Sequence, residues 1–275
     1  MPELDFEAEY NNRQRVPEHP GIIERWIAES AAARAWLGGA LDQPYGPGPR
    51  HRFDLLHAKD AAANGLPLVV YIHGGYWQSR DRKDFSFVAP VFAAKGFAVA
   101  LPSYSLCPEV TIDEIVEEMR ALIVSLWQRT RQRPVVVGHS AGGHLAAAML
   151  ATDWTGRTGV PADLVRSAYA ISGVFELTPL ISTSINGPLK LTEETARQAS
   201  PILWKPPPSE RTLVAAVGGA ESREFLRQSL DIAAAWSQAG VKAECVIVPN
   251  ANHFTVVDEL ARPESAMVAR IASLA

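Results

Sequence analysis

The segment Gly138-His139-Ser140-Ala141-Gly142 holds a serine between two glycines in the pattern G-x-S-x-G. A short apolar run at 135–137 comes before it and predicts a strand, and small residues at 141–151 predict a helix after it. At such a tight strand-to-helix turn, the serine oxygen projects beyond the strand and lies at a helix N-terminus, which favours developing negative charge. The pattern therefore predicts that Ser140 is a nucleophile, and a chance match in a glycine turn is the alternative.

A serine hydroxyl needs a base to act as a nucleophile. Of the seven histidines, His253 follows the last apolar run, at 245–248. That place fits the chain order serine, acid, histidine that strand-to-helix nucleophiles use. We expect His253 to be the base, with an ordinary loop histidine as the alternative.

The acid of such a triad should follow the preceding strand, which is predicted at 213–217. Glu221 is the first carboxylate after it and would hold the imidazole of His253 in the required tautomer. A solvated glutamate in the first turn of the next helix is the alternative. Glu224 is the second candidate, and Asp258 ranks below it because it is expected to form a capping box with Thr255.

A second glycine turn, His73-Gly74-Gly75-Tyr76-Trp77, follows an apolar run. Acyl transfer needs backbone N–H groups that point at the oxyanion, and glycine lets the backbone approach the substrate. We expect the N–H groups of Gly75, Tyr76 and Ala141 to form the oxyanion hole, and His73 to support the loop. An ordinary strand-ending turn is the alternative.

Four aromatic residues near these turns are candidates for substrate contact. They are Tyr76, Trp77, Tyr104 and Phe254. Packing in the core is an equally good explanation for Trp77.

The elements that must position these residues alternate between short apolar strands and longer helical patterns, which is typical of an α/β fold with a mostly parallel sheet covered on both faces. Strands are predicted at 68–72, 97–101, 135–137, 165–171, 213–217 and 245–248. Helices are predicted at 112–131, 141–151, 223–239 and from 255 onward, and a Thr111–Glu114 capping box begins the first of them. One domain, 1–275, is expected, with an N-terminal helix (22–37) and an edge strand (52–57) in the leading segment 1–57, and a cap insertion at 174–209.

The composition narrows the function classes. The chain has 275 residues and a net charge of −4, which argues against nucleic acid as a partner. The two cysteines, Cys107 and Cys245, are too few for a disulfide framework, and no metal or cofactor motif is present. With no apolar leader and no run of about 18 apolar residues, the expectation is a cytoplasmic protein that acts on a small molecule without a cofactor or metal and away from membranes, and that could form a homodimer.

Three segments resemble a known family. His73-Gly74-Gly75-Tyr76-Trp77-Gln78, the 138–147 segment and Tyr104 to Glu109 resemble α/β-hydrolases of the hormone-sensitive-lipase-like branch. Within that branch the chain is most similar to the arylformamidases (kynurenine formamidases). Segments 172–184 and 217–229 and the N-terminal Glu9-Tyr10-Asn11 extend the similarity over nearly the whole chain.

The resemblance implies a serine hydrolase that removes the formyl group of N-formylkynurenine, a step of tryptophan catabolism. The animal members carry aspartate where this chain has Glu221, which is one methylene longer. A broad short-chain carboxylesterase is the alternative within the enzymes. A catalytically inactive scaffold used as a binding module is the alternative from another class.

Overall fold

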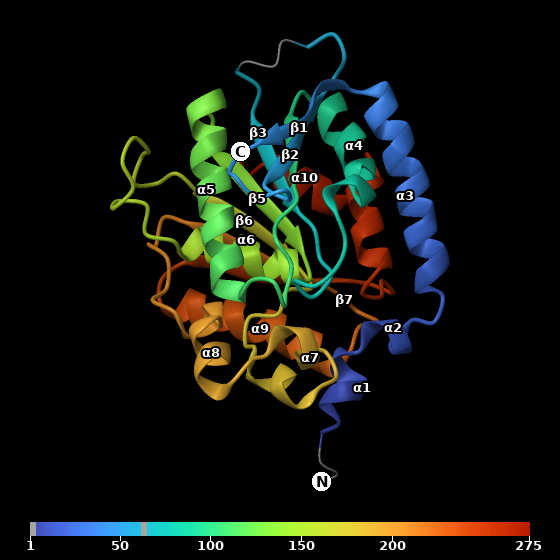
Figure 1. Cartoon of the computed structure of the whole chain (residues 1–275), viewed down its shortest axis with the longest axis vertical. Coiled ribbons are helices and arrows are strands. Elements are labelled where there is room, and N and C mark those ends of the chain that lie inside the picture. Colours follow the sequence, from blue (N-terminus) through green and yellow to red (C-terminus); the bar gives the residue numbers. More distant parts are fainter. Residues whose placement is uncertain (1–3, 62–64) are drawn as a thin grey trace.

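The computed structural model describes residues 4–61 and 65–275, and its centre is an eight-stranded sheet (Figure 1). The strand order is β1-β2-β4-β3-β5-β6-β7-β8. The pairs β1–β2 and β2–β4 are antiparallel, and the strands from β4 to β8 run parallel, which confirms the predicted α/β-hydrolase architecture. The strands are β1 (Gly38–Pro44), β2 (Arg52–His57), β3 (Leu68–Ile72), β4 (Ala98–Pro102), β5 (Pro134–His139), β6 (Ser167–Ile171), β7 (Thr212–Gly218) and β8 (Lys242–Val248).

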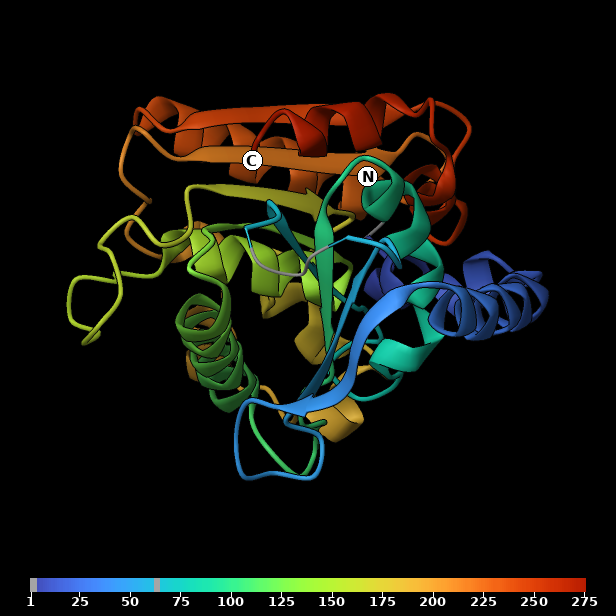
Figure 2. The same ribbon diagram turned by 90° about the horizontal axis from the view of Figure 1, so that it is seen from above.

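Helices cover both faces of this sheet, and Figure 2 shows α5 on one side and α3 on the other. The helices α5, α6 and α9 pack in one hydrophobic cluster, and α3, α4 and α10 pack in the other. The α-helices are α1 (Phe6–Tyr10), α2 (Asn12–Arg15), α3 (His19–Trp36), α4 (Ala89–Ala94), α5 (Ile112–Thr130), α6 (Ala141–Ala151), α7 (Asn186–Leu189), α8 (Glu193–Gln198), α9 (Arg223–Gln238) and α10 (Ala266–Ala272). No helix in the described ranges has the length and apolarity to cross a bilayer.

The central strand β3 shows how both faces come to be buried. Its alternate residues Leu68, Val70 and Ile72 belong to the α5/α6/α9 cluster, and Val69 and Tyr71 belong to the opposite one. All five are at most 2% exposed. A strand buried on both faces is apolar throughout, which explains the uninterrupted apolar run in the sequence.

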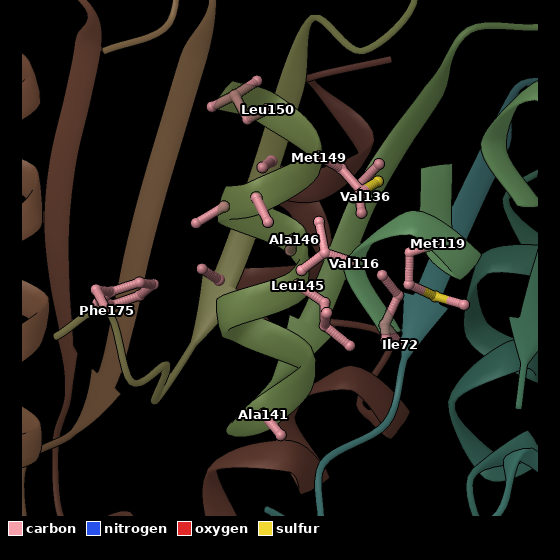
Figure 3. Packing of buried hydrophobic residues seen from close by; sticks show 14 of the residues in the cluster. Ile72, Val116, Met119, Val136, Ala141, Leu145, Ala146, Met149, Leu150 and Phe175 are labelled. Atoms are coloured by element: carbon pink, nitrogen blue, oxygen red, sulfur yellow. The ribbon is translucent and has the colours of Figure 1, made fainter. Parts of the chain in front are cut away.

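Helix α6 lies directly on this sheet and holds the site serine at its beginning. Its side chains Leu145 and Met149 lie between the sheet and α5, close to Ile72 and Val136 (Figure 3). Small residues predominate in the rest of α6 and bring its backbone close to the strands.

The predicted capping box at Thr111 is confirmed: Thr111 accepts a hydrogen bond from Glu114 N–H, and Glu114 accepts one from Thr111 N–H.

The expectation that 52–57 is an edge strand is wrong, because β1 pairs with the outer side of β2 and forms that edge of the sheet. The capping box expected between Thr255 and Asp258 is also absent. Asn252 caps that turn by exchanging hydrogen bonds with Thr255.

The segment 174–209, predicted as an insertion, consists of short helices. Besides α7 and α8, these are the 3₁₀ helices η3 (Thr178–Ser182) and η4 (Pro201–Leu203). The N-terminal helix α1 contacts η3, and Glu7 accepts hydrogen bonds from both N–H and Oγ of Ser184, at 2.7 and 2.8 Å. The leading segment and the insertion therefore meet at one end of the sheet, near the carboxyl ends of the parallel strands.

Candidate active site

Ser140 lies at the sharp turn between β5 and α6, with φ 56° and ψ −119°. Few non-glycine residues adopt such a backbone, and those that do cluster at functional sites. The neighbouring glycines make the turn possible. A Cβ on Gly138 would lie 2.0 Å from the carbonyl oxygen of Gly142, and one on Gly142 would lie 2.0 Å from that of Ile72. The two glycines of G-x-S-x-G are thus required by close backbone packing.

His253 and Glu221 are directly joined. His253 Nδ1–H donates to Glu221 Oε2 at 2.7 Å, and both residues are about 5% exposed. This bond orients the imidazole and leaves its Nε2 for proton transfer. The other carboxylate oxygen, Oε1, accepts from Ser172 Oγ at 2.5 Å and from Gly218 N–H at 2.7 Å. Glu221 is therefore held by three donors, and the extra methylene of glutamate does not prevent the contact with His253.

The two carboxylates considered as alternatives lie elsewhere in hydrogen-bond networks. Glu224 accepts from the hydroxyl of Tyr10 at 2.8 Å and pairs with Arg227. Asp258 accepts from Arg25 and from Trp26 Nε1, each at 2.7 Å, and so ties its loop to α3.

His139 packs against His253 and holds its backbone in place. Its Nε2–H donates to the carbonyl oxygen of His253 at 2.8 Å, and the two ring centres are 4.7 Å apart. Burial, together with the nearby His253, holds the pKa of His139 well below its usual range. A neutral His139 adds no like charge next to an imidazolium on His253.

The backbone N–H groups expected to form the oxyanion hole have no hydrogen-bond acceptor in the described part of the chain. Within residues 4–61 and 65–275, neither Gly75 N–H nor Tyr76 N–H donates a hydrogen bond. Ala141 is the first residue of α6, where N–H groups have no intrahelical acceptor. Gly75 has φ 113°, and a Cβ there would lie 2.3 Å from the carbonyl oxygen of Ser79, so the loop needs glycine.

His73 stabilises the glycine loop that contains Gly75. Its Nδ1–H donates to the carbonyl oxygen of Gly74 at 2.7 Å, and its ring is stacked between Phe85 and Tyr104. Burial lowers the pKa of His73 to about 4, so the ring is neutral at ordinary pH. His73 is not among the residues that line the cavity around Ser140.

A cavity of about 340 Å³ joins these parts, and Ser140, His253, Gly75 and Tyr76 all line it. Tyr76 and Phe254 line it, and their contact with a substrate stays a prediction. The expectation that Trp77 and Tyr104 contact the substrate is wrong, because both are fully buried and neither lines the cavity. The Tyr104 hydroxyl donates to the carbonyl oxygen of His73 at 2.9 Å, and Trp77 packs edge-on against His144. Both act as core residues that support the loop.

Several wall residues come from the chain before the sheet and were missing from the sequence-based site. They are Asn11, Asn12, Arg13, Ile23 and Trp26. Ser184 and Ile185 of the 174–209 segment complete the wall, along with Phe85 and the Gln78-Ser79-Arg80 stretch. No group of three or more potential metal ligands occurs in the described part of the chain.

Comparison with known proteins places this site in a family. The chain is 35% identical over 235 residues to the kynurenine formamidase of Salmo salar, covering 83% of this chain and 79% of that one. The Danio rerio kynurenine formamidase is 34% identical with the same coverage. The chain belongs to the kynurenine formamidase family. This confirms the resemblance carried by the motifs at 73–78 and 138–147.

A family model and two solved structures are consistent with membership in the kynurenine formamidase family. The BD-FAE family model matches residues 53–159. A crystal structure from Silicibacter sp. TM1040, described as a thioesterase, is 33% identical, has a TM-score of 0.87 and covers 98% of this chain and 100% of that one. The esterase of Pyrobaculum calidifontis, at 19% identity and a TM-score of 0.71 (93% and 91% coverage), shares the fold. The chain is thus a hydrolase of the formamidase or esterase type rather than an inactive binding module.

Proposed function

We propose that this chain is a serine hydrolase that cleaves small acyl amides or esters, above all formamides of aromatic amines such as N-formylkynurenine. The observation that carries the proposal is the 2.7 Å bond from His253 Nδ1–H to Glu221, in a site where Ser140 and His253 line one cavity. The names of the Salmo salar and Danio rerio relatives support the formamide substrate.

In this mechanism His253 Nε2 takes the proton of Ser140 as Oγ attacks the carbonyl carbon. The negative charge that develops on the carbonyl oxygen is bound by the N–H groups of Gly75, Tyr76 and Ala141. His253 then gives the proton to the departing amine, and the C–N bond breaks to leave a formyl ester on Ser140. Water, deprotonated by His253, releases formate and restores the serine. Glu221 stabilises the imidazolium during both steps.

Aromatic walls suit a flat leaving group. Trp26, Tyr76, Phe85 and Phe254 all line the cavity. A planar ring packs well against such side chains, whereas a formyl group needs almost no space of its own. These walls support an aryl formamide over an alkyl one.

A short-chain ester is the second candidate, because solved structures with this fold include esterases. The deciding experiment is a side-by-side measurement of kcat/KM for N-formylkynurenine and a phenyl ester of acetate. A larger value for the formamide supports the proposal. Ester hydrolysis without formate release from N-formylkynurenine would establish the esterase instead.

The cellular setting is a further part of the proposal. Cys107 and Cys245 are unpaired thiols, and burial raises the pKa of both, which fits a reducing compartment such as the cytoplasm. A homodimer stays a prediction, which light scattering on the purified protein would test.

A further inference from the structure

The wall of the cavity carries two arginines and no carboxylate. Arg13, from α2, and Arg80, from the stretch after the oxyanion loop, both line it, and no Asp or Glu is among its lining residues. The whole chain is acidic, with a net charge of −4. The positive wall is therefore a local feature that the composition does not require.

Three arginines near the cavity form ion pairs, whereas Arg13 forms none in the described part of the chain and Arg80 forms only a long one. Arg34 and Arg82 form ion pairs with Asp54, and Arg50 lies 3.4 Å from a carboxylate oxygen of Asp81. These bonds neutralise the charges around the antiparallel edge of the sheet.

Arg13, by contrast, has no acidic side chain within 4.0 Å among the residues that the structure describes. Arg80 has only a long contact of 3.9 Å with Asp84. Burial lowers the pKa of Arg80, and the nearby charge of Arg13 adds to that effect while Asp84 opposes it. Two guanidinium groups that repel each other would both gain from an anion between them.

The pair is close to the reacting group. Arg13 donates to Ser79 Oγ at 3.5 Å, and Ser79 Oγ donates to the carbonyl oxygen of Gly75 at 3.0 Å. One side chain thus separates Arg13 from the oxyanion loop. Arg13, Arg80 and Ser140 line the same cavity, so a substrate bound in it can contact all three.

We propose that Arg13 and Arg80 form an anion subsite that binds a carboxylate on the leaving group of the substrate. This rests on the proposed function, because a formyl group carries only hydrogen and the carboxylate must then belong to the amine. N-formylkynurenine carries such a carboxylate, and Arg13 and Arg80 are the residues assigned to bind it. Arg13 and Arg80 determine specificity and take no part in bond breaking.

The test compares substrates of equal shape and different charge. For wild type, Arg13→Gln, Arg80→Gln and the double variant, kcat/KM is measured for N-formylkynurenine and for its analogue with the α-carboxylate replaced by a carboxamide. We expect wild type to prefer the carboxylate by about tenfold or more, the size of a charge-assisted hydrogen bond. The preference should fall in each single variant, disappear in the double variant and weaken with added salt.

The control is Arg15→Gln, an exposed arginine at the end of α2 that does not line the cavity and should keep the full preference. Thermal unfolding checks that each variant is folded. A carboxylate-to-carboxamide ratio near one in wild type, or a ratio unchanged in the double variant, would overturn the subsite.

If the enzyme hydrolyses no formamide, the proposed function fails. In that case kcat/KM is measured for two esters instead, 4-acetoxybenzoate with its carboxylate and 4-acetoxybenzamide without it. The carboxylate-to-carboxamide ratio of kcat/KM for these esters then tests the anion subsite without relying on the formamidase activity.

Discussion

Ser172 donates a hydrogen bond of 2.5 Å to Oε1 of Glu221, while Oε2 of the same carboxylate accepts from His253. Ser172 follows β6, is fully buried and has φ 49°, a conformation that costs a non-glycine residue free energy. Its own N–H donates to the carbonyl oxygen of Ala216 at 2.7 Å. The fold thus holds a strained serine where its hydroxyl orients the acid, and we infer that Ser172 is a positioning residue.

Ser172→Ala removes that hydroxyl and leaves Glu221 Oε1 with Gly218 N–H alone. We expect kcat to fall about tenfold or more, since a hydrogen bond to a charged group is lost. KM should change little, because Ser172 does not line the cavity.

Ser172→Gly is the matched variant, because glycine accepts the positive φ without strain. Its kcat should be as low as that of the alanine variant, because both lack the hydroxyl. Its thermal unfolding temperature should be higher than that of the alanine variant. Full activity in the glycine variant would mean that the hydroxyl has no positioning role.

Glu221→Gln should lower kcat by about 10³- to 10⁴-fold, as losses of the acid in serine triads do. Glu224→Gln and Asp258→Asn serve as controls, since those carboxylates bond to Tyr10 and Trp26 rather than to His253. Steady-state kinetics on one ester decide the matter. A larger loss in either control than in Glu221→Gln would show that the acid is misassigned.

His144 is one of three buried histidines, with His73 and His139, whose lowered pKa should make the stability of the fold depend on pH. Burial lowers the pKa of His144 to about 4, even though its Nε2–H donates to the carbonyl oxygen of Ala199. In the unfolded chain the pKa is about 6.5. Between these values the unfolded chain binds more protons, so the free energy of unfolding is at its full value above about pH 6.5 and falls as the pH drops toward 4.

His144→Gln should reduce that fall by up to roughly 3 kcal/mol, the equivalent of the shift in pKa. Chemical denaturation at pH 7.5 and pH 4.5 measures it, and His19→Gln, at the half-buried start of α3, is the control. An equal fall in wild type and His144→Gln would mean that another group causes the acid sensitivity.

Acyl chains longer than about four carbons should be poor substrates. The cavity of about 340 Å³ is at the small end of ligand sites and must hold both the acyl and the leaving group. A series of p-nitrophenyl esters from formate to decanoate gives kcat/KM against length. A maximum at octanoate or beyond would show that the acyl side is open.

The sequence predicted the elements whose signal is local. Strand β3 and helix α6 have the predicted bounds, because a doubly buried strand is apolar throughout and small residues favour a closely packed helix. Strand β1 was missed because Gly38–Pro44 is half exposed and pairs through its backbone, with no apolar pattern to reveal it.

The candidate site divides in the same way. Ser140, Glu221 and His253 could be predicted because each follows a strand in the order that this chemistry uses. Ser172 also follows a strand, which was the available signal, but only its contact with Glu221 gives it a role. Arg13 is brought to the cavity by the packing of α1 against α9 and η3 and by the contact of Arg13 with Ser79, which no local pattern encodes.

The central claim is that Ser140 is a nucleophile activated by His253. A fluorophosphonate tests it directly, because an activated serine oxygen forms a bond to phosphorus and releases fluoride. After treatment, intact-protein mass spectrometry and peptide mapping should place one adduct on Ser140, with no adduct in Ser140→Ala and slow labelling in His253→Gln. Labelling of another residue in wild type, or hydrolysis by Ser140→Ala at more than a few per cent of the wild-type rate instead of the expected loss of about 10⁶-fold, would contradict the account.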